Sequence, residues 1–315
     1  PAIKKNLMYT YDATGLLQTL KDSDGNQIAY RYNGLKQLTA IVLPDLKEIS
    51  FSYTSKNLPL SVGYPNGITG RWDYDSSDRI IKISYQDKAG KIVAGWTYTY
   101  DPAGNIIEQK ANQGHISYFT YDPAGQLIEE SSPEKKIQYR YGPGGNRSSV
   151  EETGIILHYQ HDKADRIIKV GEENFSYDGN GNLINRKDAK VQTTYDYNAE
   201  NRLIKVSRSD GNITGFGYAP TGERVWRRDS QGLTYSMYDG YNLIQELGEK
   251  GNPTAIYVHG PGIDRPLAML KDGQWYFYHA DRLGSIKLLT DSQGKIASAY
   301  EYDAFGKIRS QQGSI

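Results

Sequence analysis

Residues 98–128 read YTYDPAGNIIEQKANQGHISYFTYDPAGQLI and contain two copies of one motif. In each copy two aromatic residues stand two positions apart, so they point to one face of a β-strand. A turn follows, Asp101-Pro102-Ala103-Gly104 in one copy and Asp122-Pro123-Ala124-Gly125 in the other. Aspartate can bond the nearby backbone, proline fixes φ, and glycine in fourth place accepts the left-handed conformation of a bulged turn. The apolar residues after each glycine predict the returning strand.

The motif repeats along nearly the whole chain, with most steps of 20 or 21 residues. Degenerate copies surround His259 and Tyr278, and the last copy is Tyr300–Ile308. A second turn, such as Asp22-Ser23-Asp24-Gly25, separates successive copies. Two turns in each period leave two strands of ordinary length. The second aromatic position is held by Tyr11, Tyr32, Tyr53, Tyr74, Tyr100, Tyr121, Tyr141, His161, Tyr177, Tyr197, Tyr218 and Tyr238. The turn residues that we single out are Asp12, Gly15, Asp101, Pro102, Gly104, Asp122, Pro123, Gly125, Asp178 and Gly181.

This periodicity predicts an all-β protein, a continuous antiparallel meander of about fifteen hairpins. Residues 1–308 are expected to form one repeat array, with residues 309–315 as a polar tail. An open twisted sheet rarely stays open beyond ~10 strands, so about thirty strands must curl into a hollow wall, a spiral or a solenoid. A β-propeller is the alternative, but blades of four strands would give a period near twice the observed one.

Composition narrows the possible functions. The 315 residues include 37 basic and 37 acidic side chains, and this balance argues against nucleic-acid binding. The chain contains no cysteine, which excludes disulfides and thiolate metal sites, and no apolar run is long enough to cross a bilayer. No signal peptide is visible, and the missing initiator methionine suggests an excised or processed piece. With 27 tyrosines and 6 phenylalanines, the chain is expected to be thin and well hydrated.

Several residue groups suggest chemistry, but each has a simpler structural interpretation. His279, Asp281 and Ser285 could form a catalytic triad, although a bend at Gly284 would separate them. His158 and His161 with Asp162 and Asp165 could bind a metal, but His161 occupies a repeat aromatic position. The turn aspartates supply too few ligands for calcium. We therefore predict no catalytic residue, metal site or cofactor. Rings that could stack on sugars, but that more simply form cross-strand ladders, are Trp72, Trp96, Trp226 and Trp275.

The repeats resemble the YD repeats of the RHS family. Residues 275–308 resemble the closing part of an RHS core, and we expect a structural role for its signature residues. In this family such repeats build a spiral β-shell that encloses a C-terminal toxin domain, or, in teneurins, a shell used in cell adhesion. The resemblance implies a secreted or cell-surface bacterial protein. The self-cleavage segment of toxin-bearing members is not recognisable here. The signature residues are His279, Asp281, Leu283, Gly284, Ser285, Tyr302, Asp303 and Gly306.

The sequence therefore predicts a non-enzymatic shell or scaffold segment that encloses or displays a polypeptide cargo. Its expected partners are that cargo and adjoining shell segments, with self-association also possible and no nucleic acid among them. The alternative is a binding module whose aromatic surface contacts a glycan or a cell-surface partner. An enzyme is the third hypothesis, and it would require the groups around His279 and Asp281 to converge.

Overall fold

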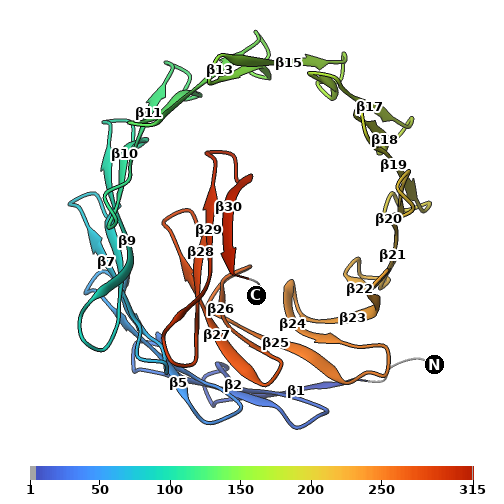
Figure 1. The fold of residues 1–315 in the computed structure, drawn as a ribbon. Helices are drawn as coiled ribbons and strands as arrows, with labels where there is room; N and C mark the ends of the chain where they lie inside the picture. Colours follow the sequence, from blue (N-terminus) through green and yellow to red (C-terminus); the bar gives the residue numbers. More distant parts are fainter. Residues whose placement is uncertain (1–4, 314) are drawn as a thin grey trace. The chain divides into compact units, whose positions relative to one another are not determined.

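The computed structural model describes residues 5–313 and 315, and within them it contains thirty β-strands and no helix. None of these residues belongs to a helix that could span a membrane. Figure 1 follows the strands in chain order. They are β1 (Leu7–Tyr11), β2 (Leu17–Asp22), β3 (Gln27–Tyr32), β4 (Leu38–Val42), β5 (Glu48–Tyr53), β6 (Pro59–Gly63), β7 (Thr69–Tyr74), β8 (Ile80–Gln86), β9 (Ile92–Tyr100), β10 (Ile106–Ala111), β11 (Ile116–Tyr121), β12 (Leu127–Ser132), β13 (Lys135–Tyr141), β14 (Arg147–Glu152), β15 (Ile155–His161), β16 (Ile167–Val170), β17 (Glu173–Tyr177), β18 (Leu183–Lys187), β19 (Gln192–Tyr197), β20 (Leu203–Arg208), β21 (Ile213–Tyr218), β22 (Arg224–Asp229), β23 (Gly232–Asp239), β24 (Asn242–Leu247), β25 (Pro253–His259), β26 (Pro266–Lys271), β27 (Gln274–Ala280), β28 (Ile286–Asp291), β29 (Ile296–Tyr302) and β30 (Ile308–Gly313).

Successive strands pair antiparallel as hairpins, as in β17–β18, β18–β19 and β19–β20. Where a strand ends on the second aromatic of the repeat, the register shifts by one residue, for example between Ser176 and Tyr177. The turn that follows places Gly181 at φ 87°, in the left-handed region that glycine accepts. The structure confirms the predicted all-β meander of tandem hairpins.

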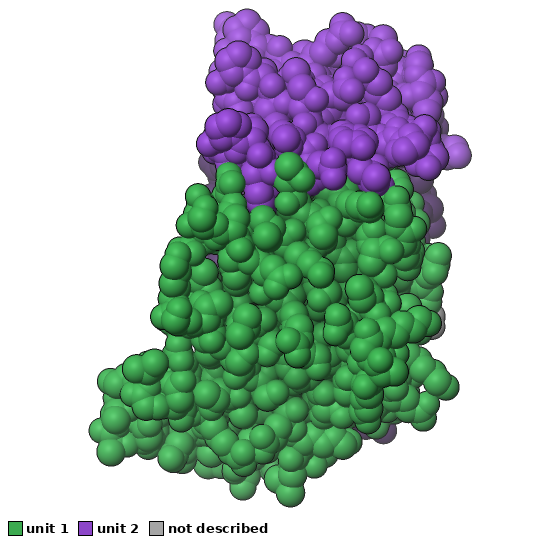
Figure 2. Space-filling view, turned by 90° about the vertical axis from the view of Figure 1, so that its left-hand side faces the viewer, with its two compact units in different colours: residues 1–99, 109–115, 254–315 green, residues 100–108, 116–253 purple. Residues whose placement is uncertain are grey.

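The chain forms two compact units, which Figure 2 colours separately. Unit 1 contains residues 1–99, 109–115 and 254–315, and unit 2 contains residues 100–108 and 116–253. Because each unit contains several hairpins from the same repeat series, a single array over residues 1–308 remains our prediction for the domain organisation. Residues 309–313 of the predicted polar tail lie in β30 (Ile308–Gly313), which pairs with β29.

Unit 1 has a filled core. The strands after residue 254 lie against those of the first hundred residues, and tyrosine hydroxyls of those early residues bond to the backbone of β27. Ala255, Met269, Tyr276 and Leu289 form a second cluster within the late strands. The burial of large side chains on both segments shows that unit 1 is held by a conventional apolar core. The fully buried large side chains include Ile41, Leu43, Ile49, Ile68, Ile83, Val258 and Phe277.

Unit 2 has few buried side chains. Along β19, exposed and half-buried residues alternate strictly, and β17 repeats the pattern. Alternation with period two places the half-buried rings on one face of the sheet and polar side chains on the other. Unit 2 is therefore mostly a sheet one layer thick. Its buried residues, among those described, are Ile137, Tyr139, Ser149, Ile244, Gln245, Leu247 and Gly251.

Candidate functional site

The repeat turns are held by their aspartates. In the turn after β17, one oxygen of Asp178 accepts the backbone N–H groups of Asn180 (2.9 Å) and Asn182 (2.8 Å). Asp12 binds the amides of Thr14 and Leu16 in the same way. Hydrogen bonds to the ionised form, first that from the Asn182 side chain, lower the pKa of Asp178. These carboxylates are used to close turns.

The second tyrosine of a repeat fastens one hairpin to the previous one. The Tyr197 hydroxyl donates to the carbonyl of Leu183 (3.0 Å), the first residue of β18, and Tyr218 donates to Leu203 (2.8 Å), the first of β20. Phenylalanine could cover the same area but could not make this bond. Tyrosine therefore holds this position in most repeats, and His161 replaces it in one. The same bond to the first residue of a returning strand is made by Tyr53, Tyr74, Tyr121, Tyr141, Tyr177 and Tyr302.

Three tyrosines of the first hundred residues, one in a turn and two in strands, hold the backbone of the closing segment, residues 278–282. The Tyr64 hydroxyl donates to the Tyr278 carbonyl (2.9 Å). The Tyr85 hydroxyl donates to the Ala280 carbonyl (2.9 Å) and accepts the Ala280 N–H (3.1 Å). The Tyr98 hydroxyl accepts the N–H of residue 282 (3.2 Å). Tyr64 and Tyr85 thus bond to alternate residues of β27.

His279 lies in the centre of this contact and is fully buried. Its Nε2 is 2.8 Å from the hydroxyl of Thr290, which also accepts the side-chain N–H of Asn66 (2.8 Å). The rings of Tyr64 and Tyr85 pack edge-on against the imidazole, at 5.0 and 4.7 Å between centroids. Burial lowers the pKa of His279 to about 3. The histidine is therefore neutral at physiological pH and binds the two segments together.

Asp281 begins the turn after β27. Its Oδ1 accepts the N–H groups of Leu283 (2.9 Å) and Ser285 (3.1 Å), and Gly284 adopts φ 84°. Lys287 Nζ lies 3.8 Å from the other oxygen. Burial raises the pKa of Asp281, and the lysine opposes that rise. Within residues 5–313, no hydrogen bond joins the side chains of His279, Asp281 and Ser285 into a triad.

The last repeat ends in the same kind of turn. Tyr302 donates its hydroxyl to the Ile286 carbonyl (2.9 Å). Asp303 accepts the N–H groups of Phe305 (3.0 Å) and Lys307 (2.8 Å), and Gly306 has φ 84°. The signature residues that the sequence singles out in 279–306 therefore lie in hairpin turns and strand contacts. Their structural role in closing the array remains our prediction.

The residues considered for metal or sugar binding have other contacts. Asp162 Oδ2 accepts from Arg166 Nε (2.8 Å), and Asp165 accepts from Asn146 (2.7 Å). Trp96 packs edge-on against Tyr85, which contacts Trp72 in the same manner. Trp96 and Trp275 are buried. These two rings consequently present no open face on which a sugar could stack.

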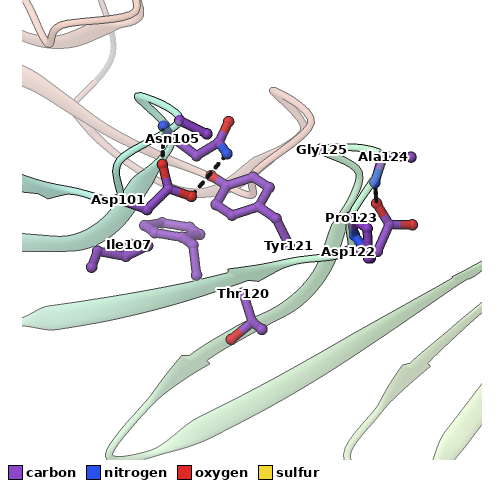
Figure 3. Close-up of a pocket in the computed structure, with 11 residues that line it drawn as sticks. Asp101, Asn105, Ile107, Thr120, Tyr121, Asp122, Pro123, Ala124 and Gly125 are labelled. Atoms are coloured by element: carbon purple, nitrogen blue, oxygen red, sulfur yellow. Dashed lines mark hydrogen bonds between the residues drawn. The ribbon is translucent and has the colours of Figure 1, made fainter.

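A cavity of about 640 Å³ opens in unit 2 between two successive repeat turns, residues 101–105 and 122–125. Figure 3 shows Asp101, Asn105 and Ile107 on one side and the second turn on the other, with Tyr121 between them. Asn105 donates its side-chain N–H back to Asp101 Oδ2 (2.9 Å). This bond, followed by that from the Asn105 backbone, lowers the pKa of Asp101, so the carboxylate is ionised. The cavity combines an aromatic wall with an acidic edge.

A long hairpin array with a tyrosine–aspartate turn in many of its repeats defines a repeat β-shell. The chain belongs to the teneurin YD-shell family, whose model matches residues 4–91 and 88–314. It is 27% identical to the tRNA3(Ser)-specific nuclease WapA of Bacillus spizizenii over 316 residues, which cover 97% of this chain and 12% of that protein. It is also 27% identical to double-stranded DNA deaminase toxin A of Burkholderia cenocepacia, over 69% of this chain and 17% of that protein.

Among solved structures, the Tc holotoxin pore of Photorhabdus luminescens contains a chain that superposes with a TM-score of 0.81 at 18% identity. The match covers 98% of this chain and 18% of that one. At this identity the likeness shows a common fold. The chain thus spans less than a fifth of the length of these similar proteins, and it is a segment of RHS/YD-type shell.

Sequence reasoning missed the anchoring tyrosines Tyr64 and Tyr85, which lie outside the second aromatic position of the repeats. It also missed Thr290 and Asn66, the buried partners of the closing histidine. The only sequence signal for an anchoring role was the position of Tyr64 in a turn between repeats, where most copies carry a polar residue. The aspartate turns were accessible from the sequence because their residues are adjacent in the chain.

Proposed function

We propose that this chain forms part of the wall of a container that encloses a polypeptide cargo, and that it catalyses no reaction itself. The observation that carries the proposal is the single-layer sheet of unit 2, in which few side chains are buried and strands such as β17 and β19 alternate half-buried and exposed residues. A globular enzyme buries its sheet on at least one face. A one-layer sheet with solvent on both sides is suited to separating two compartments.

The similar proteins support a toxin domain as the cargo. Two of them are named for activities on nucleic acid, and the chain matches only 12% and 17% of their lengths. We propose that such activities belong to other segments of those proteins and that the matching segment provides the enclosure. Adjoining shell segments would then be its other partners. Export from the cell is part of the same proposal, since a carrier of toxin must leave its producer.

Small-angle scattering with inline mass determination tests whether the chain forms part of a hollow wall. A compact, filled chain of this length should have a radius of gyration of about 20 Å. A clearly larger value with a hollow profile, from a monomer or a defined oligomer, is the expected result. A filled compact monomer would refute the container, and screening against glycans would then test the binding-module alternative.

Limited proteolysis of the natural full-length protein tests the enclosure. We expect the cargo segment to resist trypsin in the intact protein and to be digested once residues 116–253 are deleted. Equal digestion of the cargo in both proteins would contradict a container role. As a control, the cargo domain expressed alone should be cut at the same sites as in the deletion variant.

A further inference from the structure

The face of the unit 2 sheet that lies opposite the repeat aromatics is polar at one regular position. This position is the third residue of the returning strand, together with the residue directly opposite on the strand before it. In the hairpin β21–β22 the pair is Gly217 and Trp226. One hairpin thus places a large aromatic ring where the hairpins before it carry polar side chains. The equivalent polar pairs are Thr120–Glu129, Arg140–Ser149, Gln160–Lys169, Ser176–Asn185 and Asp196–Lys205.

The Trp226 indole lies flat on two glycines of β21. A side-chain carbon built at Gly217 would lie 1.8 Å from Nε1 of the indole, and one at Gly215 would lie 3.5 Å from Cζ3. Only glycine at 217 therefore leaves room for the ring. One face of the ring covers these glycines, and since Trp226 is only half-buried, its exposed area lies on the outer face and the edge. Among the residues that the structure describes, none accepts a hydrogen bond from the indole N–H.

The neighbouring strand β23 adds a second ring. Tyr235 lies directly opposite Trp226, so the two side chains are on the same face of the sheet. Tyr235 is also half-buried, and its hydroxyl makes no hydrogen bond to any of residues 5–313. By contrast, Tyr197 and Tyr218 on nearby strands use their hydroxyls to hold the backbone. Two aromatic side chains with unused polar groups thus stand on adjacent strands.

Two cations border this pair of rings. Gly215, under the far end of the indole, pairs with Lys205 on one side and with Arg228 on the other. Lys205 is exposed, and although Asp196 lies opposite it on β19, it makes no ion pair within the described part of the chain. Arg228 lies 3.5 Å from Glu249, and both side chains are largely exposed, so this pair is weak. The border therefore favours a ligand with hydrogen-bond acceptors and negative charge.

We propose that Trp226 and Tyr235 form a docking surface for a proline-rich, acidic segment of another polypeptide in the polyproline II conformation. Proline rings pack on aromatic surfaces, and the carbonyls of such a segment have no internal hydrogen bonds, so they are free to accept. The indole N–H and the tyrosine hydroxyl would each donate to one carbonyl, while Lys205 and Arg228 would face acidic side chains. The proposal goes beyond the container role, because a filled monomer in scattering would leave this surface in place.

The test is NMR of the full chain labelled with nitrogen-15 in its tryptophan indoles, in which Trp226→Phe identifies the Trp226 signal. The capped peptide acetyl-Glu-Pro-Pro-Glu-Pro-Pro-amide should shift that signal, with a dissociation constant on the order of 1 mM. With lysine in place of glutamate, binding should be about fivefold weaker or more. No shift at about 10 mM peptide, or equal binding of the lysine peptide, would overturn the proposal. Tighter binding of the acidic sugar digalacturonate would overturn the assignment to a polypeptide.

Three variants separate this surface from a purely structural role of the ring. Tyr235→Phe keeps the ring and removes the hydroxyl, so it should weaken peptide binding about fivefold. Lys205→Gln should weaken binding about threefold or more and reduce its dependence on salt. Lys169→Gln is the matched control, since Lys169 holds the same repeat position in β16, and it should leave binding unchanged. Equal effects of Lys205→Gln and Lys169→Gln, or full binding by Tyr235→Phe, would contradict the docking surface.

Discussion

Replacing Tyr85 by phenylalanine tests how the closing segment is attached. The Tyr85 hydroxyl makes two hydrogen bonds to one residue, donating to the Ala280 carbonyl (2.9 Å) and accepting its N–H (3.1 Å). Tyr85 is 2% exposed, so water has little access to replace the hydroxyl. A net hydrogen bond contributes about 1 kcal/mol, and a buried group left without a partner costs about 1–3 kcal/mol. We expect Tyr85→Phe to lower the free energy of unfolding by about 2 kcal/mol or more.

Tyr53→Phe provides the matched control, because it removes a single hydroxyl bond, to the Leu38 carbonyl (2.8 Å), in the same unit. It should cost about 1 kcal/mol. Both changes can be measured by urea unfolding, with the fluorescence of the buried Trp96 and Trp275 as the signal. Amide hydrogen exchange at Ala280 should also accelerate in Tyr85→Phe alone. If Tyr85→Phe costs no more than Tyr53→Phe, the double anchoring bond does not hold the segment as we argue.

Three further predictions concern single residues. Leu46 is 83% exposed and has φ 66° in a repeat turn, a left-handed conformation that is costly for leucine and not for glycine. Leu46→Gly should therefore raise the free energy of unfolding by about 1 kcal/mol, and a lower thermal midpoint would contradict this. Because burial lowers the pKa of His279 from 6.5 to about 3, the unfolded chain takes up the proton first as the pH falls. The free energy of unfolding should therefore fall by about 1.4 kcal/mol for each unit that the pH is lowered between pH 6 and pH 5. In His279→Gln the urea midpoint should lack this dependence on pH. Asp178→Ala should lower the urea midpoint at pH 7, and Asp178→Asn should lower it less, since it keeps one acceptor oxygen. Because hydrogen bonds lower the folded pKa of Asp178, the difference in midpoint between the wild type and Asp178→Asn should vanish as the pH falls through that lowered pKa, and a difference that persists in stronger acid would contradict this.

The hairpins could be predicted because their determinants are local. Five consecutive residues determine each turn, and the aspartate, the glycine and the aromatic pair recur at a nearly regular spacing. Even where glycine is absent, as at Asn57 and Asp78, the position keeps its left-handed conformation, with φ 65° and 62°. Asparagine and aspartate tolerate that region better than other side chains. The period therefore predicted the strand order and the pairing of neighbours.

The packing of the closing segment could not be predicted in the same way. Tyr64 and its acceptor Tyr278 are 214 residues apart, and no periodicity relates them. The expectation of a thin, hydrated structure fits unit 2 but missed the core of unit 1, because composition averages the two. The cavity between residues 101–105 and 122–125 was equally hidden, since its space depends on how two successive turns lie together.

The attachment of β27 to the early part of the chain also sets the order in which parts of the protein can fold during synthesis. Each hairpin of unit 2 needs only its immediate neighbours, so it can form as soon as it leaves the ribosome. The hydroxyl of Tyr64 must wait for an acceptor that is translated 214 residues later. At ~5–20 residues per second the delay is about 10–40 s. During that interval Ile68, which lies beside Gly294 in the folded chain, is uncovered, and the nascent chain is then most exposed to aggregation and most in need of chaperones.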